Sequence, residues 1–121
     1  MLLGSFYQIN DIQHQDQNDL VQISFNPSHE IFKGHFPHLP VVPGVCQIQI
    51  LEEVISHVTA KPYVVKEAGQ VKFLALLNPV KSPTITLDIH RESTNDGTIA
   101  VTARYFSDTE TFFRFKGQLH A

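Results

Sequence analysis

Residues 34–60 read GHFPHLPVVPGVCQIQILEEVISHVTA, and this stretch decides which folds are open to the chain. Because each proline fixes φ and lacks a backbone donor, the proline-rich residues 27–43 predict an ordered loop without regular structure. Pro43 then suits a first helical position, where its missing N–H costs nothing. After it, apolar residues recur at helical spacing, at positions 45, 48, 51, 55 and 58. We therefore expect one amphipathic helix that ends near Thr59 or Ala60.

Alternation of apolar and polar residues on both sides of this helix predicts strands. The clearest case is Leu20–Asn26, and Pro27 stops it. The polar run 13–19 predicts a loop, and Asn95-Asp96-Gly97 predicts a hairpin turn because these residues tolerate positive φ. The other predicted strands are 5–13, 63–77 with a break at 67–69, 84–90, 98–106 and 111–119.

A lone amphipathic helix needs a sheet against which to bury its apolar face. The element order therefore predicts an α+β fold in which an antiparallel β-sheet wraps around one central α-helix, as a single domain over residues 1–121. The edge strands of such a sheet stay exposed unless a second chain covers them, so we also expect a dimer.

The composition narrows the class of protein further. The 121 residues are 42% hydrophobic and 17% charged, which is typical of one globular domain. Nine Lys+Arg against 12 Asp+Glu give a net charge of -3, so we expect no nucleic-acid partner. No apolar run suits a secretion signal or a membrane span, and the single Cys46 leaves no disulfide or zinc cluster. A cytoplasmic location is the expectation.

The loop and the helix start together suggest a site for carbonyl chemistry. His35 lies in the rigid loop, nine residues before Gly44 at the predicted helix N-terminus. The first amides of a helix have no intrahelical acceptor and carry the positive end of the dipole. A base close to such an amide suits proton abstraction beside a carbonyl. Gly44 has no side chain to block a ligand.

Here the chain resembles the β-hydroxyacyl-acyl carrier protein dehydratases, the FabA/FabZ group of hotdog-fold enzymes. The first motif is His35-Phe36-Pro37-His38-Leu39-Pro40-Val41-Val42-Pro43-Gly44-Val45. The second is Val71-Lys72-Phe73 followed by Asn78-Pro79-Val80, and the resemblance covers about residues 5–119. It implies a hotdog homodimer that eliminates water from a 3-hydroxyacyl thioester to give the 2-enoyl thioester. It also implies acyl carrier protein or coenzyme A as the carrier, no cofactor, and a place in lipid metabolism such as fatty acid biosynthesis.

The resemblance also implies residue roles. His35 matches the histidine that removes the C2 proton, and Gly44 matches the glycine whose N–H polarises the thioester carbonyl. The carbonyl of Val41 matches the group that holds the other imidazole nitrogen. The predicted substrate-binding residues are Phe36, Pro37, Val41, Val42, Pro43, Val45 and Phe73.

The chain departs from the family at the second catalytic group, a Glu or Asp that the partner subunit supplies. That position, five residues after Gly44, is Gln49, and a neutral amide is no useful proton donor. Glu53 lies one turn further on the same helix face, where FabZ-type members often carry Gln, and is the candidate substitute acid. His38 also replaces the second glycine of the motif.

Two other functions stay open. The first is a hotdog acyl thioesterase in which Glu53 activates water. The second is a non-catalytic acyl-binding or partner subunit, which the Gln49 change favours. We expect no metal, because Pro37 separates His35 from His38 and no third ligand completes a set. Six basic residues on the predicted strands or beside them include candidates for the basic patch that an acidic carrier protein needs: Lys61, Lys66, Lys72, Arg104, Arg114 and Lys116.

Overall fold

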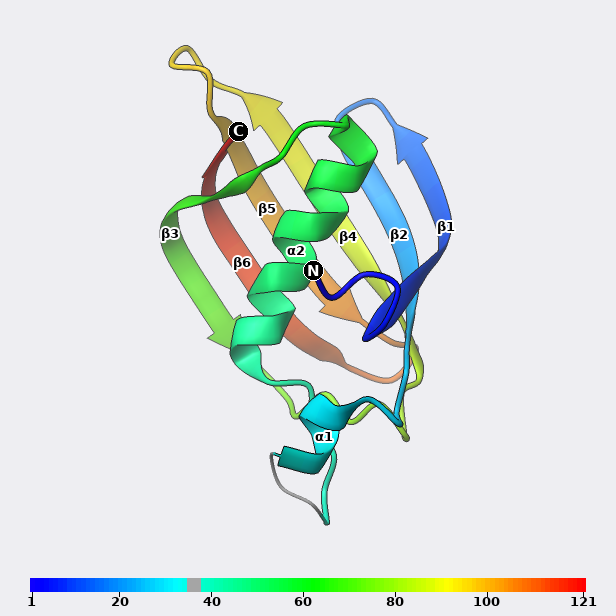
Figure 1. Ribbon diagram of the computed structural model, residues 1–121. Coiled ribbons are helices and arrows are strands. Elements are labelled where there is room, and N and C mark those ends of the chain that lie inside the picture. The colour runs from blue at the N-terminus through cyan, green and yellow to red at the C-terminus, as the bar shows by residue number, and fades with distance from the viewer. Residues whose placement is uncertain (35–37) are drawn as a thin grey trace.

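A six-stranded antiparallel sheet curls around one long helix (Figure 1). The computed structural model describes residues 1–34 and 38–121, so His35, Phe36 and Pro37 lie outside the described residues. The strand order is β1-β2-β4-β5-β6-β3, which leaves β1 and β3 at the edges. The strands are β1 (Tyr7–Gln15), β2 (Asn18–Phe25), β3 (Val64–Phe73), β4 (Thr84–Ser93), β5 (Ile99–Phe106) and β6 (Thr111–His120). The helices are α1 (Glu30–Gly34) and α2 (Gly44–Thr59).

The core lies between the concave face of the sheet and α2. Every second side chain of β2, β4 and β5 points inward, as the alternation predicted. From α2, Ile50, Leu51, Val54 and Ile55 are fully buried against them. The helix ends where Ala60 adopts a left-handed conformation with φ 58°. The predicted antiparallel sheet around one central helix is confirmed. Among the described residues, neither helix is both long and apolar enough to cross a membrane.

The structure corrects three expectations about the elements. The loop predicted for 27–43 contains the five-residue helix α1, which fits between Pro27 and the later prolines and buries Phe32 against Phe6. The loop predicted for 13–19 is mostly strand, because β1 and β2 pair down to Gln15 and Asn18. Backbone pairing does not require apolar side chains, so the polar run concealed this hairpin.

The third correction concerns the end of β3. The predicted strand 63–77 stops at Phe73, and the chain then leaves the sheet so that the carbonyl of Leu77 accepts the N–H of Val42 at 2.8 Å. The predicted break at 67–69 takes the form of bulges, where the pairing with β6 shifts between Val65 and Glu67 and between Ala68 and Gln70.

Candidate active site

The predicted binding residues that the structure describes gather at the N-terminus of α2. Val41 and Val42 are buried just before the helix, and Gly44 opens it. Gln47 holds the helix start against the preceding loop, because its side-chain Nε2 donates to the carbonyl of Val42 at 3.1 Å. The carbonyl of Gln47 in turn accepts the hydroxyl of buried Tyr105 at 2.7 Å. The helix start is thus held to the sheet and to the preceding loop.

Phe73 covers the first residue of the helix. Its ring lies so close to Gly44 that a Cβ there would come within 2.7 Å of Cζ. The ring also packs on Phe113, with centroids 5.2 Å apart, and remains 51% exposed. Val45, Leu74 and other apolar side chains near the helix start are exposed as well. Exposed apolar side chains therefore lie beside the helix start, at the end of β3.

We expect Gly44→Ala to lower kcat/KM for the predicted thioester substrate by about tenfold, which is about 1.4 kcal/mol of transition-state stabilisation. The added methyl group must push the Phe73 ring off the helix start. Because the ring is half-exposed and can move, we expect little change in the unfolding temperature. Steady-state kinetics and thermal unfolding check this. The double variant Gly44→Ala/Phe73→Leu should regain part of the activity, and no regain would mean that the ring is not the cause.

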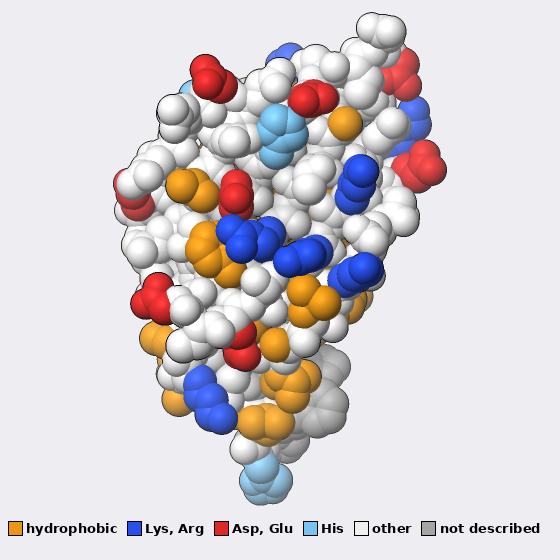
Figure 2. All heavy atoms as spheres, turned by 180° about the vertical axis from the view of Figure 1, so that it is seen from behind, with side chains coloured by type: hydrophobic (Ala, Val, Ile, Leu, Met, Phe, Trp, Pro, Cys, Tyr) orange, Lys and Arg blue, Asp and Glu red, His pale blue; other side chains and the backbone are white. Residues whose placement is uncertain are grey.

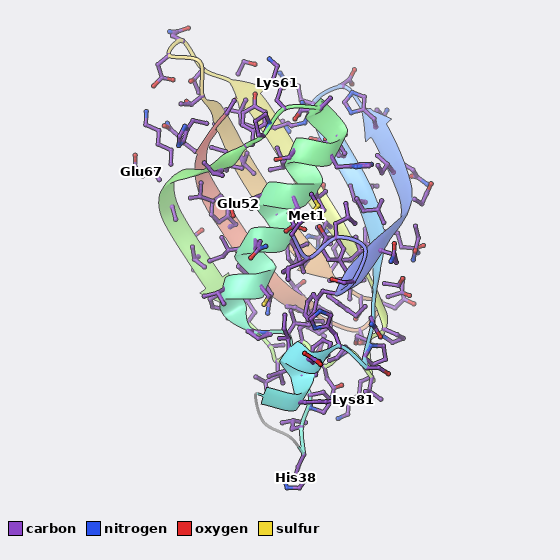
Figure 3. The ribbon with its side chains drawn as sticks, viewed as in Figure 1. Met1, His38, Glu52, Lys61, Glu67 and Lys81 are labelled. Atoms are coloured by element: carbon purple, nitrogen blue, oxygen red, sulfur yellow. The ribbon has the colours of Figure 1, made fainter. Side chains whose placement is uncertain are left out.

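Gln49 and Glu53 lie further along α2, and they bind each other. Gln49 Nε2 donates to Glu53 Oε2 at 2.8 Å, as expected for side chains one turn apart. Glu53 also accepts the backbone N–H groups of Leu2 and Leu3 at 2.8 Å each and the hydroxyl of Tyr7 at 3.0 Å. The segment that begins at Met1 starts in front of α2 and leads toward β1 (Figure 3). Four donors from three segments thus converge on one carboxylate.

These contacts set the charge of Glu53. Burial raises the pKa of Glu53, but the N–H of Leu2, the amide of Gln49, the N–H of Leu3 and the hydroxyl of Tyr7 together hold it below its usual value. The pKa of Tyr7 is raised by burial and by the adjacent Glu53 charge. Glu53 is therefore an ionised anchor that has no proton to give at neutral pH. Its assignment as the substitute acid stays a prediction, which these contacts do not favour. Its assignment as a water-activating base, which requires the ionised form, also stays a prediction.

We expect Glu53→Gln to lower the free energy of unfolding at pH 7 by about 2 kcal/mol, because charge-assisted hydrogen bonds contribute about 1.5–3 kcal/mol. Since the folded-state pKa of Glu53 is lowered, its stabilisation is present above the unfolded pKa of about 4.3 and is lost as the pH falls through the folded value. Urea unfolding is measured at several pH values from neutral to acid. The free energies of unfolding of the wild type and of Glu53→Gln should become equal in acid. The control Glu110→Gln, at an exposed glutamate, should leave the free energy of unfolding almost unchanged. An equal loss of stability in both variants would contradict the role of Glu53 as an anchor.

A hollow of about 480 Å³ begins at Gln49 and runs along α2 to His57, between the N-terminal segment and the start of β3. Cys46 is buried, and its burial and the charge of Glu53 both raise the pKa of its thiol, which disfavours the reactive thiolate. His38 lies at the lower tip of the molecule, away from α2 (Figure 3). Among residues 1–34 and 38–121, no group of three His, Cys, Asp or Glu side chains could hold a metal ion.

Comparison with known proteins now identifies the family. A sequence model described as ApeI-like, for the ApeI dehydratase, matches residues 11–112, which is most of the chain. The chain belongs to the ApeI-like dehydratase family. The predicted resemblance to the FabA/FabZ group is thereby confirmed, with this chain as a divergent member. A 3-hydroxyacyl-[acyl-carrier-protein] dehydratase FabZ from Novosphingobium aromaticivorans is 34% identical over 73 residues, which are 55% of this chain and 46% of the relative. The match thus spans less than half of that relative's length.

Solved structures confirm the hotdog fold. A chain of the dehydratase heterocomplex ApeI:P from Xenorhabdus doucetiae superposes with a TM-score of 0.76 at 26% identity, covering 93% of this chain and 96% of that one. A protein from the thioesterase superfamily superposes with a TM-score of 0.65 at 10% identity, and the superposition covers 93% of this chain and 82% of that one. At that identity the second likeness shows the fold alone.

Proposed function

We propose that this ApeI-like chain is a subunit of a dehydratase that converts a 3-hydroxyacyl thioester into the 2-enoyl thioester. Membership of the family supports the reaction class. The covered helix start at Gly44 supports a site for the thioester carbonyl, whose oxygen would accept the Gly44 N–H. His35, nine residues earlier in the sequence, is the proposed base. Acyl carrier protein, named for the FabZ relative, is the proposed carrier, with coenzyme A as the alternative.

The reaction needs one base and one acid. His35 would take the C2 proton, the C2–H electrons would form the C2=C3 bond, and the C3–O bond would break. The departing hydroxide needs a proton to leave as water, and general acid catalysis of such a step is worth about 10²–10⁴ in rate. An amide at Gln49 that already donates to an ionised Glu53 supplies no such proton.

The Gln49–Glu53 hydrogen bond is therefore the observation that shapes the proposal. In a homodimer of this chain, both sites would face a Gln49 of the partner subunit. We propose that the fully active form is a complex with a second hotdog subunit that carries Glu or Asp at this helix position. The heterocomplex among the similar structures supports such an assembly. The homodimer and the cytoplasmic location inferred from the sequence remain predictions.

A product assay tests the function. The purified chain is incubated with 3-hydroxyacyl thioesters of acyl carrier protein and of coenzyme A, alone and with an acid-bearing family member from the same organism. Mass spectrometry should show the loss of one water, faster in the mixture. Release of free acid would instead indicate a thioesterase. Unchanged thioester under every condition would contradict the dehydratase and support a binding role.

A further inference from the structure

Three ionisable side chains share the concave face of the sheet with the core. Charged side chains of both signs are otherwise scattered over the outer face, as expected for a solvated surface (Figure 2). Asp19 of β2 lies two residues before buried Val21, and His14 of β1 lies directly opposite Asp19. Arg91 of β4 lies two residues beyond buried Ile89, which is itself opposite Asp19. These three residues, His14, Asp19 and Arg91, are called the inner polar cluster.

Asp19 orients the other two members of the inner polar cluster. Its Oδ1 accepts a hydrogen bond from His14 Nδ1 at 2.5 Å, and its Oδ2 accepts one from Arg91 Nε at 2.9 Å. The side chain of Asp19 is only 1% exposed, whereas those of His14 and Arg91 are 54% and 24% exposed. A buried carboxylate needs such partners. Because Asp19 is already paired with them, a further cation beside it is disfavoured.

The inner polar cluster borders a hollow of about 300 Å³. The hollow is lined by Ile12, His14, Asp19, Arg91 and two residues of α2, His57 and Val58. The last turn of α2 lies beside the turn between β1 and β2, where the hollow is found (Figure 1). Within the described part of the chain, Nε2 of His14, the Nη atoms of Arg91 and the ring of His57 make no hydrogen bond. Unused nitrogen atoms from three elements thus surround a space at the lower end of the volumes of small-molecule sites.

The unused nitrogen atoms suit an anion. Arg91 is always charged, and an imidazole gains a positive charge when it takes up a proton. Because His14 directs Nδ1 at Asp19, its Nε2 becomes a donor only when the ring is protonated. With His14 and His57 protonated, three cations meet the one carboxylate. This excess outweighs the negative charge of roughly one half at the C-terminal end of a helix, which alone would repel an anion.

We propose that this hollow binds a phosphate group. A phosphate presents oxygens in several directions, so it accepts from β1, β4 and α2 together, whereas Arg91 alone matches the two oxygens of a carboxylate. The hollow accommodates inorganic phosphate or the phosphate end of a small monoester. Gly44 and His57 lie near opposite ends of α2, about 20 Å apart along the helix. The phosphate site is therefore separate from the candidate active site, and it does not depend on the proposed reaction.

Two variants test the site because they keep a partner for Asp19 and remove the unused donors. In His14→Asn the amide replaces Nδ1 and cannot gain a proton, and in Arg91→Lys the ammonium pairs with Asp19 but lacks the Nη atoms. Calorimetry measures the affinity for inorganic phosphate and for methyl phosphate, and NMR of the imidazole signals locates the bound anion. We expect each variant to weaken phosphate binding by about tenfold or more. The matched control His90→Asn, on the outer face of β4, should bind as the wild type does.

Sulfate tests the uptake of protons, because it is also a tetrahedral oxyanion and its charge is constant near neutral pH. The charged and titratable groups around His14 are Asp19 of β2, Arg91 of β4 and His57 of α2. The affinity for sulfate should rise as the pH falls from about 8 to about 6, because the imidazoles donate to the anion only when protonated. This rise should be smaller in His14→Asn and absent in His14→Asn/His57→Asn.

Tighter binding of methyl phosphate than of inorganic phosphate would identify a phosphorylated compound as the ligand, and the reverse order would identify the free ion. Either order supports the site. No saturable binding by the wild type, or binding that leaves the His14 signals unmoved, would overturn the proposal. Equal weakening by His90→Asn, or equal affinity for acetate, would show that charge alone attracts the anion and would also overturn it. Variants that lower the unfolding temperature but keep the phosphate affinity would make the cluster purely structural, against the proposal.

Discussion

Exchanging the two helix residues, in the variant Gln49→Glu/Glu53→Gln, is expected to raise the dehydration rate of the chain by itself by about 10²-fold or more. The exchange places a carboxylic acid at the family's acid position and a hydrogen-bonding amide one turn later, with no change in net charge. The side chains are nearly isosteric, but the exchange also removes the charged acceptor of Leu2, Leu3 and Tyr7, so thermal unfolding and thioester binding are measured beside the rate. Steady-state kinetics on a 3-hydroxyacyl thioester measure it. A swapped protein that folds, binds the thioester and shows no gain would contradict the role of position 49.

The single variant Gln49→Glu should behave differently, because Glu53 accepts a bond from the side chain at position 49 at 2.8 Å. Two carboxylates at this distance share a proton, and the pKa of one is raised. We expect a gain of about tenfold, smaller than for the exchange, since the proton is bound between the two groups. Because a general acid works only when protonated, the rate should fall as the pH rises through the raised pKa. The exchange variant should lose activity at lower pH than the single variant.

The second large effect is expected for His35→Ala, which should lower turnover by about 10²–10⁴-fold in the exchange variant or in an active complex. The imidazole is the proposed base for the C2 proton. Product formation is followed by mass spectrometry, and circular dichroism and thermal unfolding check the fold. His38→Ala is the matched control, because His38 is an exposed histidine of the same motif. Equal losses in both variants, or near-normal activity of His35→Ala, would contradict the assignment.

The sequence predicted the parts of the fold that follow from periodicity. The apolar spacing after Pro43 is long enough to define α2 as a helix, and the helix ends where predicted. The short helix α1 was missed because five residues between prolines are too few for a periodic signal. The polar hairpin at Gln15 and Asn18 was missed because its pairing uses the backbone alone.

The candidate site was predictable only where its residues are close in sequence. The spacing of Gln49 and Glu53 predicted a shared helix face, and their hydrogen bond confirms it. The donors from Leu2, Leu3 and Tyr7 could not be predicted, since they lie 46 to 51 residues away and two of them are backbone amides without a side-chain signal. The alignment of Arg104, Arg114 and Lys72 on neighbouring strands could not be predicted for a similar reason, because it depends on the register between β3, β5 and β6.

In the proposed assembly, a complete site combines His35 of one subunit with an acid at position 49 of another. Complementation between two proteins that each lack one of the two proposed catalytic groups tests it most directly. One is the wild-type chain, which lacks the acid, and the other is His35→Ala/Gln49→Glu/Glu53→Gln, which lacks the base. The two are co-expressed with different tags, the mixed dimer is isolated, and its enoyl thioester is quantified.

We expect the mixed dimer to form enoyl thioester faster than either protein alone by about 10²-fold or more, because one of its two sites holds both groups. A mixed dimer of the wild-type chain with His35→Ala alone, which has no acid, is the control and should show no gain. A mixed dimer that forms and is no more active than its parents would contradict the account.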